Sequence, residues 1–390
     1  MTIAICPRCN KNYDTSKYSM CPDCGKENTD EEVFRNSDRY LKEQSPLVVE
    51  ERKKAGLDGL VGGLEAIIIN TEVDRHEGAA KELLRYTGYD WIGSFMDEQF
   101  ATSVLSRKES ADILIRSRLQ KKNPFHKFNL NPKSEHLPNT RLETFVFRTG
   151  NIEPYVEIQR ARGVQFLTED IVRNSSYSFI QTKPSEYSGI SIGIIQWHDE
   201  PGNYNTHKSE LMKIELYKPD RSYLNNIHFL DHTATRVRAQ DRDAAILEFL
   251  KLTNYDFQFA IYVQEFNSIT SVARLSAKDF AMVFTAGITP YNDQEDSGPT
   301  EKFIYNFGTR VHHMAFVTEN IENTFKAIKD DGMQFLIELV GSPEDGLKQT
   351  FSETSEHTLL VSEYIHRYGG FDGFFTKSNV TLLTEATDKQ

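Results

Sequence analysis

The sequence predicts an α+β fold made of four copies of one module, preceded by a small metal-binding segment. Two stretches of the first half recur in the second half in the same order, which indicates an internal duplication. Both copies have the pattern of a strand, a turn, an amphipathic helix and a further strand. All four cysteines lie within the first 24 residues, so they belong to a separate unit.

The N-terminal segment, residues 1–27, is predicted to bind a metal because it contains two Cys-x-x-Cys pairs. Paired cysteines in a chain that has no others favour metal ligation over disulfides. Four thiolates can surround one ion as a tetrahedron, and the segment resembles a zinc ribbon or rubredoxin-like knuckle. A redox dithiol pair and a rubredoxin-type iron site are the alternatives, and the segment could dock a protein partner or stabilise the chain end. The predicted ligands of a structural zinc are Cys6, Cys9, Cys21 and Cys24.

Size, charge and hydropathy narrow the class of protein. A length of 390 residues fits two or three domains, and a net charge of -12 makes nucleic acid a poor partner. No apolar run is long enough to cross a membrane. The first residues lack the basic and apolar regions of a signal peptide, so we expect a cytoplasmic protein. Residues 28–58 are highly charged and are predicted to form a solvated linker that could hold one helix.

The internal repeat sets the domain boundaries. Residues 141–153 match residues 310–322, and the match continues without a gap to 163–167 against 332–336. A second match joins residues 87–91 to residues 253–257. The chain therefore holds modules in the order A-B-A-B, at about 60–120, 138–200, 226–290 and 308–375. We expect one domain over residues 59–220 and a second over residues 221–390.

This organisation resembles the vicinal-oxygen-chelate superfamily, whose members pair βαβββ modules into cupped sheets that hold one metal ion. Within it, the chain is similar to the 4-hydroxyphenylpyruvate dioxygenase family over about residues 60–390. That family has four such modules and keeps its metal in the second half. The resemblance implies a scaffold domain without metal, followed by a catalytic domain. The N-terminal knuckle is an addition to this architecture.

Two histidines of the second half lie where the first half has no ligand. The repeat projects His232 onto Ala66 and His313 onto Thr144, as expected if one metal site of a duplicated protein is retained. His312 is the competitor of His313. Because neighbouring strand residues face opposite sides, only one of the two can point into the cup, and the family pattern favours His313.

The resemblance supplies a third ligand, Glu363, in an apolar strand followed by a glycine pair. Two histidines and one carboxylate on one face of Fe(II) leave positions for a 2-oxo acid and O2. The implied activity is oxidative decarboxylation and hydroxylation of an aromatic 2-oxo acid such as 4-hydroxyphenylpyruvate. Family members are commonly dimers or tetramers.

The resemblance also implies a set of substrate-facing residues. Gln349 would be a polar contact, Phe351 one aromatic wall, Phe371 or Phe374 a second wall, and Asn379 part of a lid. Residues 381–386 would form a gate helix. Ordinary core packing is the alternative role of the aromatic residues.

Two departures from the family pattern concern the substrate. Residues 284–290 replace a Pro-Ile-Asn-Glu-Pro-like stretch, and residues 298–302 lack a substrate-binding glutamine. The substrate can therefore differ from 4-hydroxyphenylpyruvate. The alternatives are benzylic hydroxylation as in hydroxymandelate synthases, a non-redox metal-dependent lyase or isomerase, and a ligand-binding protein without catalysis.

Overall fold

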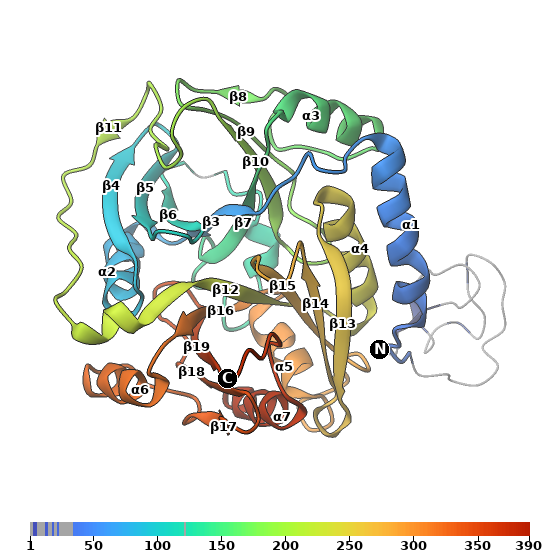
Figure 1. The fold of residues 1–390 in the computed structure, drawn as a ribbon. Helices are drawn as coiled ribbons and strands as arrows, with labels where there is room; N and C mark the ends of the chain where they lie inside the picture. The colour runs from blue at the N-terminus through green and yellow to red at the C-terminus, as the bar shows by residue number, and fades with distance from the viewer. Residues whose placement is uncertain (1–2, 6–11, 15–17, 19–21, 23–33, 121) are drawn as a thin grey trace.

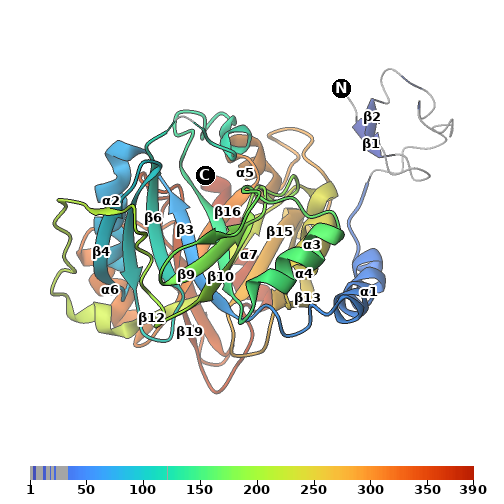
Figure 2. The same ribbon diagram turned by 90° about the horizontal axis from the view of Figure 1, so that it is seen from above.

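The structure, a computed structural model, describes residues 3–5, 12–14, 18, 22, 34–120 and 122–390. Strands β1 (Ile3–Ile5) and β2 (Asn12–Asp14) form an antiparallel pair that lies beyond helix α1, apart from the body of the molecule (Figure 2). The four predicted zinc ligands lie outside the described residues, so the structural zinc stays a prediction.

Two large sheets make up the body (Figure 1). The first has the order β11 (Glu210–Leu211), β4 (Asp90–Met96), β5 (Phe100–Ser106), β6 (Asp112–Arg118), β3 (Leu64–Asn70), β7 (Arg141–Arg148), β10 (Ser191–Trp197), β9 (Tyr177–Gln181), β8 (Val172–Arg173). The second has the order β13 (Asp256–Val263), β14 (Ser268–Arg274), β15 (Ala281–Gly287), β12 (Ile227–Arg236), β16 (Arg310–Thr318), β19 (Val361–Arg367), β18 (Leu347–Phe351), β17 (Val340–Ser342).

Each sheet consists of two βαβββ modules whose first strands pair antiparallel, β3 with β7 and β12 with β16. One helix follows the first strand of each module: α2 (His76–Tyr86), α3 (Ile152–Ala161), α4 (Arg242–Leu252) and α6 (Ile321–Asp330). The strand order outside β11 is the same in both sheets. The predicted α+β fold of four modules in two cupped sheets is therefore confirmed.

Side chains point alternately to the two faces of each strand, and this separates two apolar regions of the protein. On β3, Ile67 and Ile69 belong to the large core that packs the sheets against the helices and against each other. Ala66 and Ile68 face the other side, into the cup of the first sheet. Successive strand residues point to opposite faces, so one short apolar run serves both regions.

Two buried arginines at equivalent positions join the halves. Arg141 donates to the backbone oxygen of Thr309 at 3.0 Å, and Arg310 donates to the backbone oxygen of Thr140 at 2.5 Å. Both side chains are almost fully buried. The reciprocal contacts relate the halves by an approximate twofold axis between β7 and β16, in agreement with the duplication read from the sequence.

Part of the predicted charged linker forms helix α1 (Arg39–Ala55), which packs against the body of the protein. Within residues 34–58, the helix is docked on α4 through buried Leu41 and Val48. Its Arg52 donates to three backbone oxygens around the C-terminal end of α4 and pairs with Asp256 at 2.8 Å. The expectation of a solvated linker fails for this helix because a buried arginine satisfies the carbonyls at a helix end, which a count of charges does not reveal.

Three further elements surround the second sheet. Helix α5 (Pro299–Phe307) precedes β16, and α7 (Lys377–Ala386) with the short η6 (Thr387–Lys389) closes the open side of the cup. Among the described residues, no helix combines the length and the apolar character that crossing a lipid bilayer requires.

Candidate metal centre

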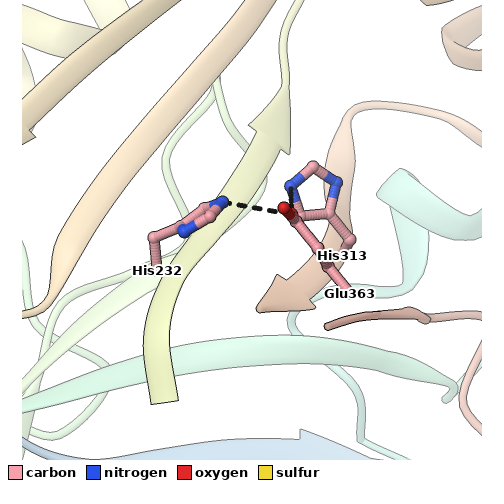
Figure 3. A group of neighbouring side chains, drawn as sticks. All are labelled: His232, His313 and Glu363. Carbon is pink, nitrogen blue, oxygen red and sulfur yellow. Dashed lines mark ion pairs between the residues drawn. The ribbon is translucent and has the colours of Figure 1, made fainter. Parts of the chain in front are cut away.

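The three predicted ligands meet inside the second sheet (Figure 3). Nε2 of His232 and Nε2 of His313 each lie 3.2 Å from Oε2 of Glu363. All three residues are buried, and their ligand atoms lie within 4.8 Å of one another. They come from three adjacent strands, β12, β16 and β19, so the sheet itself fixes their spacing.

A β-bulge on β12 adds a fourth residue to the cluster. The pairing of β12 with β16 steps by two residues on β12 for one on β16 between Leu230 and His232. Asp231 is the extra residue, and its Oδ2 lies 2.7 Å from Nδ1 of His232. Arg367 then holds both oxygens of Asp231 at 2.8 Å. A carboxylate on the far nitrogen orients a ligating imidazole and raises its basicity.

A second bulge places His312 on the same side as its neighbour. Here β16 steps by two residues between His313 and Val311 while β12 steps by one. The expectation that only one of the two histidines faces the cup is therefore wrong, because alternation holds only for regular strands. His313, which approaches Glu363, remains the candidate ligand, and His312 lies behind it.

The hydrogen bonds of His312 fix which nitrogen of His313 is free. Nε2 of His312 donates to Oε1 of Gln390 at 2.8 Å, and Nδ1 of His312 accepts from Nδ1 of His313 at 2.8 Å. This assignment follows from the network because the carboxamide oxygen can only accept. Nε2 of His313 is then left without a proton, with its lone pair toward Glu363.

The electrostatics of the cluster differ between the two candidate histidines. Burial opposes the charged form of His232, but the carboxylates of Glu363 and Asp231 outweigh it and raise the pKa to about 9. For His313, burial and the electrostatic influence of His312, His232 and Arg236 hold the pKa well below the usual value. Ligation of a cation by His232 therefore requires loss of a proton below about pH 9.

The cluster opens into a pocket inside the cup. The lining residues leave about 520 Å³ free of protein atoms, part of it in contact with solvent. Gln349 and Phe351, two of the residues predicted to face substrate, lie in its wall. The ring of Phe351 stands 4.7 Å from that of His313. Helix α7 and the following turn cover the pocket with Val380, Leu383, Thr384 and Thr387.

The other predicted substrate-facing residues lie behind the wall. The ring of Phe374 packs 5.2 Å from that of His232 but does not line the pocket, and its neighbour Phe375 does. Phe371 packs against Leu347 and Ile365. Asn379 is buried and donates to the backbone oxygen of Leu347.

Sequence reasoning missed the residues that support the ligands, Asp231, Arg367 and Gln390, and it missed Arg236 in the pocket wall. The sequence did contain a signal for Asp231, which is an acid directly before a candidate ligand. Such an acid can accept a hydrogen bond from the neighbouring histidine when a β-bulge turns both side chains to the same side. Arg367 was visible only as part of the family pattern. For Gln390, which lies far along the chain from His312, we find no sequence signal.

The strand register also identifies the equivalent positions of the first half. Ala66 pairs with Val146 as His232 pairs with Ala315, and Gly193 pairs with Val146 as Glu363 pairs with Ala315. Thr144 stands in the place of His313. The first cup is filled instead by side chains that include Phe95, Phe179, Trp197 and Tyr204.

Two solved structures resemble this chain over most of its length. A mutant of 4-hydroxymandelate synthase from Streptomyces coelicolor has a TM-score of 0.63 at 14% identity, covering 84% of this chain and 98% of that chain. The chain therefore shares the fold of that protein, which here consists of two cupped sheets of βαβββ modules. A xylose isomerase-like TIM barrel/4-hydroxyphenylpyruvate dioxygenase fusion protein has a TM-score of 0.61 at 13% identity, covering 90% of this chain and 58% of that chain. A scan against protein-family models and a search of curated proteins gave no match.

Proposed function

We propose that the protein is an Fe(II)- and O2-dependent oxygenase that oxidatively decarboxylates and hydroxylates an aromatic 2-oxo acid. The observation that carries the proposal is the convergence of His232, His313 and Glu363 at the base of the pocket. Two imidazoles and one carboxylate on one side of a site are typical of non-haem Fe(II) oxygenases. The proteins of similar fold are named as a 4-hydroxymandelate synthase and a 4-hydroxyphenylpyruvate dioxygenase fusion, which supports the same class of reaction.

The residues fit a divalent metal ion. Each Nε2 lies 3.2 Å from the same carboxylate oxygen, a separation that suits donors about 2.1 Å from one shared ion. The acceptors at Asp231 and His312 take the Nδ1 protons and leave both Nε2 lone pairs for the metal. Iron bound there would supply the oxidation chemistry with O2.

The remaining pocket residues would bind and orient the substrate. Oε1 of Gln349 is buried with no hydrogen-bond partner, so it can accept a hydrogen bond from a substrate group or a bound water. Phe351 and Phe375 would flank an aromatic ring. The apolar side chains of α7 would limit the access of water during turnover.

The decisive experiment is anaerobic reconstitution with Fe(II), followed by O2 consumption measured across a series of aromatic 2-oxo acids. The proposal requires uptake of O2 and release of CO2 with at least one of them. Product analysis then separates hydroxylation of the ring from hydroxylation at the benzylic carbon. Preference for nickel or zinc at this site without O2 uptake would instead indicate a lyase or isomerase, and no metal binding would indicate a ligand-binding protein.

We also propose a structural zinc at Cys6, Cys9, Cys21 and Cys24, where it could stabilise a segment that docks a protein partner. Metal analysis of Cys21→Ser should show loss of zinc with unchanged Fe(II) affinity. Loss of iron in this variant would refute the separation of the two metal sites. A homodimer or tetramer is a further expectation that sedimentation would test.

A further inference from the structure

The far end of the pocket holds a buried cation that no acid neutralises. Arg236 is 5% exposed and lines the pocket, and among the described residues no carboxylate forms an ion pair with it. Its Nη1 has no hydrogen-bond partner, and its guanidinium stacks 4.4 Å from the ring centre of Phe303. A buried charge is costly unless it is paired, so this position is prepared for an anion that the chain itself does not provide.

The first half shows how the same fold neutralises such a charge. There Arg118 forms a buried ion pair with Glu143 at 2.6 Å, and Glu143 is the bulge residue of β7. The bulge residue of β16 at the equivalent position is His312, whose side chain has no carboxylate to pair with an arginine. The second half therefore has an imidazole at the position where the first half has the neutralising acid.

Arg236 belongs to a polar layer across three adjacent strands. It pairs in register with Thr285 on β15, and Thr285 pairs with Thr270 on β14. All three line the pocket, and Oγ1 of Thr285 is buried with no hydrogen-bond partner. An arginine and two hydroxyl groups on one layer offer the donors that a carboxylate accepts.

On β12 and β15, the pocket-facing residues between this cation and the metal centre are apolar. Ala234 lies between His232 and Arg236 on the pocket face of β12, and it pairs with Val283 on β15. Arg236 is four positions after His232, which corresponds to roughly 13 Å between their Cα atoms along the strand. The pocket thus runs from a metal site, through an apolar zone that suits a ring, to a cation.

We propose that the substrate is a dianionic aromatic 2-oxo acid, with a carboxylate at the end of the ring opposite the oxo acid, held by Arg236, Thr270 and Thr285. The proposal rests on the proposed function for the assignment of the oxo-acid end. It agrees with the departures near residues 284–290 and 298–302, since Thr285 and Thr300 line this end of the pocket.

Calorimetric titration without O2 tests the proposal. 4-Carboxyphenylpyruvate and phenylpyruvate are titrated into the Fe(II)-loaded full chain, and into the metal-free chain if iron does not bind. The wild-type protein should bind the dianion about 10- to 100-fold more tightly, because a buried cation pairs with its second carboxylate. Equal affinity for the two compounds would overturn the proposal.

Substitutions in the pocket test whether Arg236 causes the tighter binding of the dianion. Arg236→Gln should reduce the affinity ratio to about 1, Arg236→Lys should keep part of it, and Thr285→Val should lower dianion binding several-fold while phenylpyruvate binding is unchanged. Asn70→Ala, at the register position of the first half that corresponds to Arg236, is the matched control and should leave the ratio unchanged. Fe(II) affinity serves as the check of folding for each variant.

The outcomes separate this proposal from the proposed function. A preference for the dianion that survives in Arg236→Gln would refute the role of Arg236, whatever the enzyme does with O2. Conversely, a preference that disappears in Arg236→Gln, with no O2 uptake for any aromatic 2-oxo acid of the series, would support the anion site and refute the oxygenase. Both results come from binding and O2 measurements made separately.

Discussion

The two halves share one backbone plan but use the inside of the cup in opposite ways. At the bulge of β12, Asp231 accepts hydrogen bonds from Nη1 and Nη2 of Arg367 and orients His232. At the equivalent bulge of β3, Glu65 accepts a hydrogen bond from the indole of Trp197 at 2.9 Å. The same geometry therefore orients a candidate metal ligand in one half and holds an aromatic side chain that fills the cup in the other.

This difference shows that the bulges belong to the fold, and the side chains on them decide the function. Both sheets step out of register at two equivalent places of their central strand pair, and β12 has one further step between Ile227 and Leu230. A bulge turns an additional side chain toward the cup, so each sheet has positions for supporting groups behind its central residues. Within the described residues, the second half has candidate metal ligands at the central positions and keeps space beside them.

The largest effect is expected from removal of a ligand. His313→Ala should weaken Fe(II) binding by more than about 100-fold, beyond the cost of losing a supporting residue, and should abolish O2 uptake. Anaerobic titration with Fe(II) measures the affinity. Thr144→Ala, the matched change in the first half, should leave iron binding unchanged, and an equal loss there would contradict the division between the halves.

A ligand introduced into the first half should damage it without creating a site. A side chain at Gly193, the position equivalent to Glu363, would bring its Cβ to 2.9 Å from Cε2 of Phe179 and 3.1 Å from Cγ2 of Val146. Gly193→Glu also buries an unpaired carboxylate, so we expect about 4 kcal/mol of lost stability in denaturant unfolding. Gly193→Ala should cost about 1–3 kcal/mol. If Gly193→Glu were as stable as the wild type, the side chains that fill the first cup would not be tightly packed around Gly193.

The third prediction concerns Glu301 on α5, an element of the second half. Its oxygens accept backbone N–H groups of Ala239, Gly287 and Tyr291, but burial outweighs these bonds and raises the pKa to about 7. The folded state thus binds the proton more tightly than the unfolded state, whose value is 4.5. The stability from this group is fully present below pH 4.5 and is lost as the pH rises to about 7.

Glu301→Gln removes this titration. The difference in unfolding free energy between wild type and Glu301→Gln should shift by about 3 kcal/mol against the wild type between pH 4.5 and pH 8. Urea unfolding of both proteins over that range measures the shift. A difference that is constant with pH would show that Glu301 keeps an ordinary pKa in the folded state.

The smallest effect is expected for Asp231, the bulge residue that supports His232. Asp231→Asn should weaken Fe(II) binding by about 10- to 100-fold, because the amide is a poorer acceptor for Nδ1 of His232. Glu65→Gln is the matched change and should not alter iron binding, since its partner is Trp197. Equal losses in the two variants would mean that the effect of Asp231 is general destabilisation.

The sequence predicted the repeat, the four modules and the meeting of His232, His313 and Glu363. The modules and the two histidines could be predicted because a duplication leaves patterns that can be compared position by position, whereas Glu363 was predicted from the resemblance to a known family. The prediction for His312 failed because alternation assumes a regular strand, and bulges cannot be read from a pattern of apolar residues. The wall position of Phe374 is taken by its neighbour Phe375 for a related reason, since the turn before α7 sets which ring faces inward.

The sequence by itself determined the module order and the half of the chain that carries the candidate metal ligands, because both depend on residue identity at repeated positions. Only the tertiary structure decided which groups stand behind the ligands and what the far end of the pocket offers. Asp231, Gln390 and Arg236 acquire their roles from strand register and from burial beside distant segments. Those interactions depend on distances in space, which the spacing of residues along the chain does not encode.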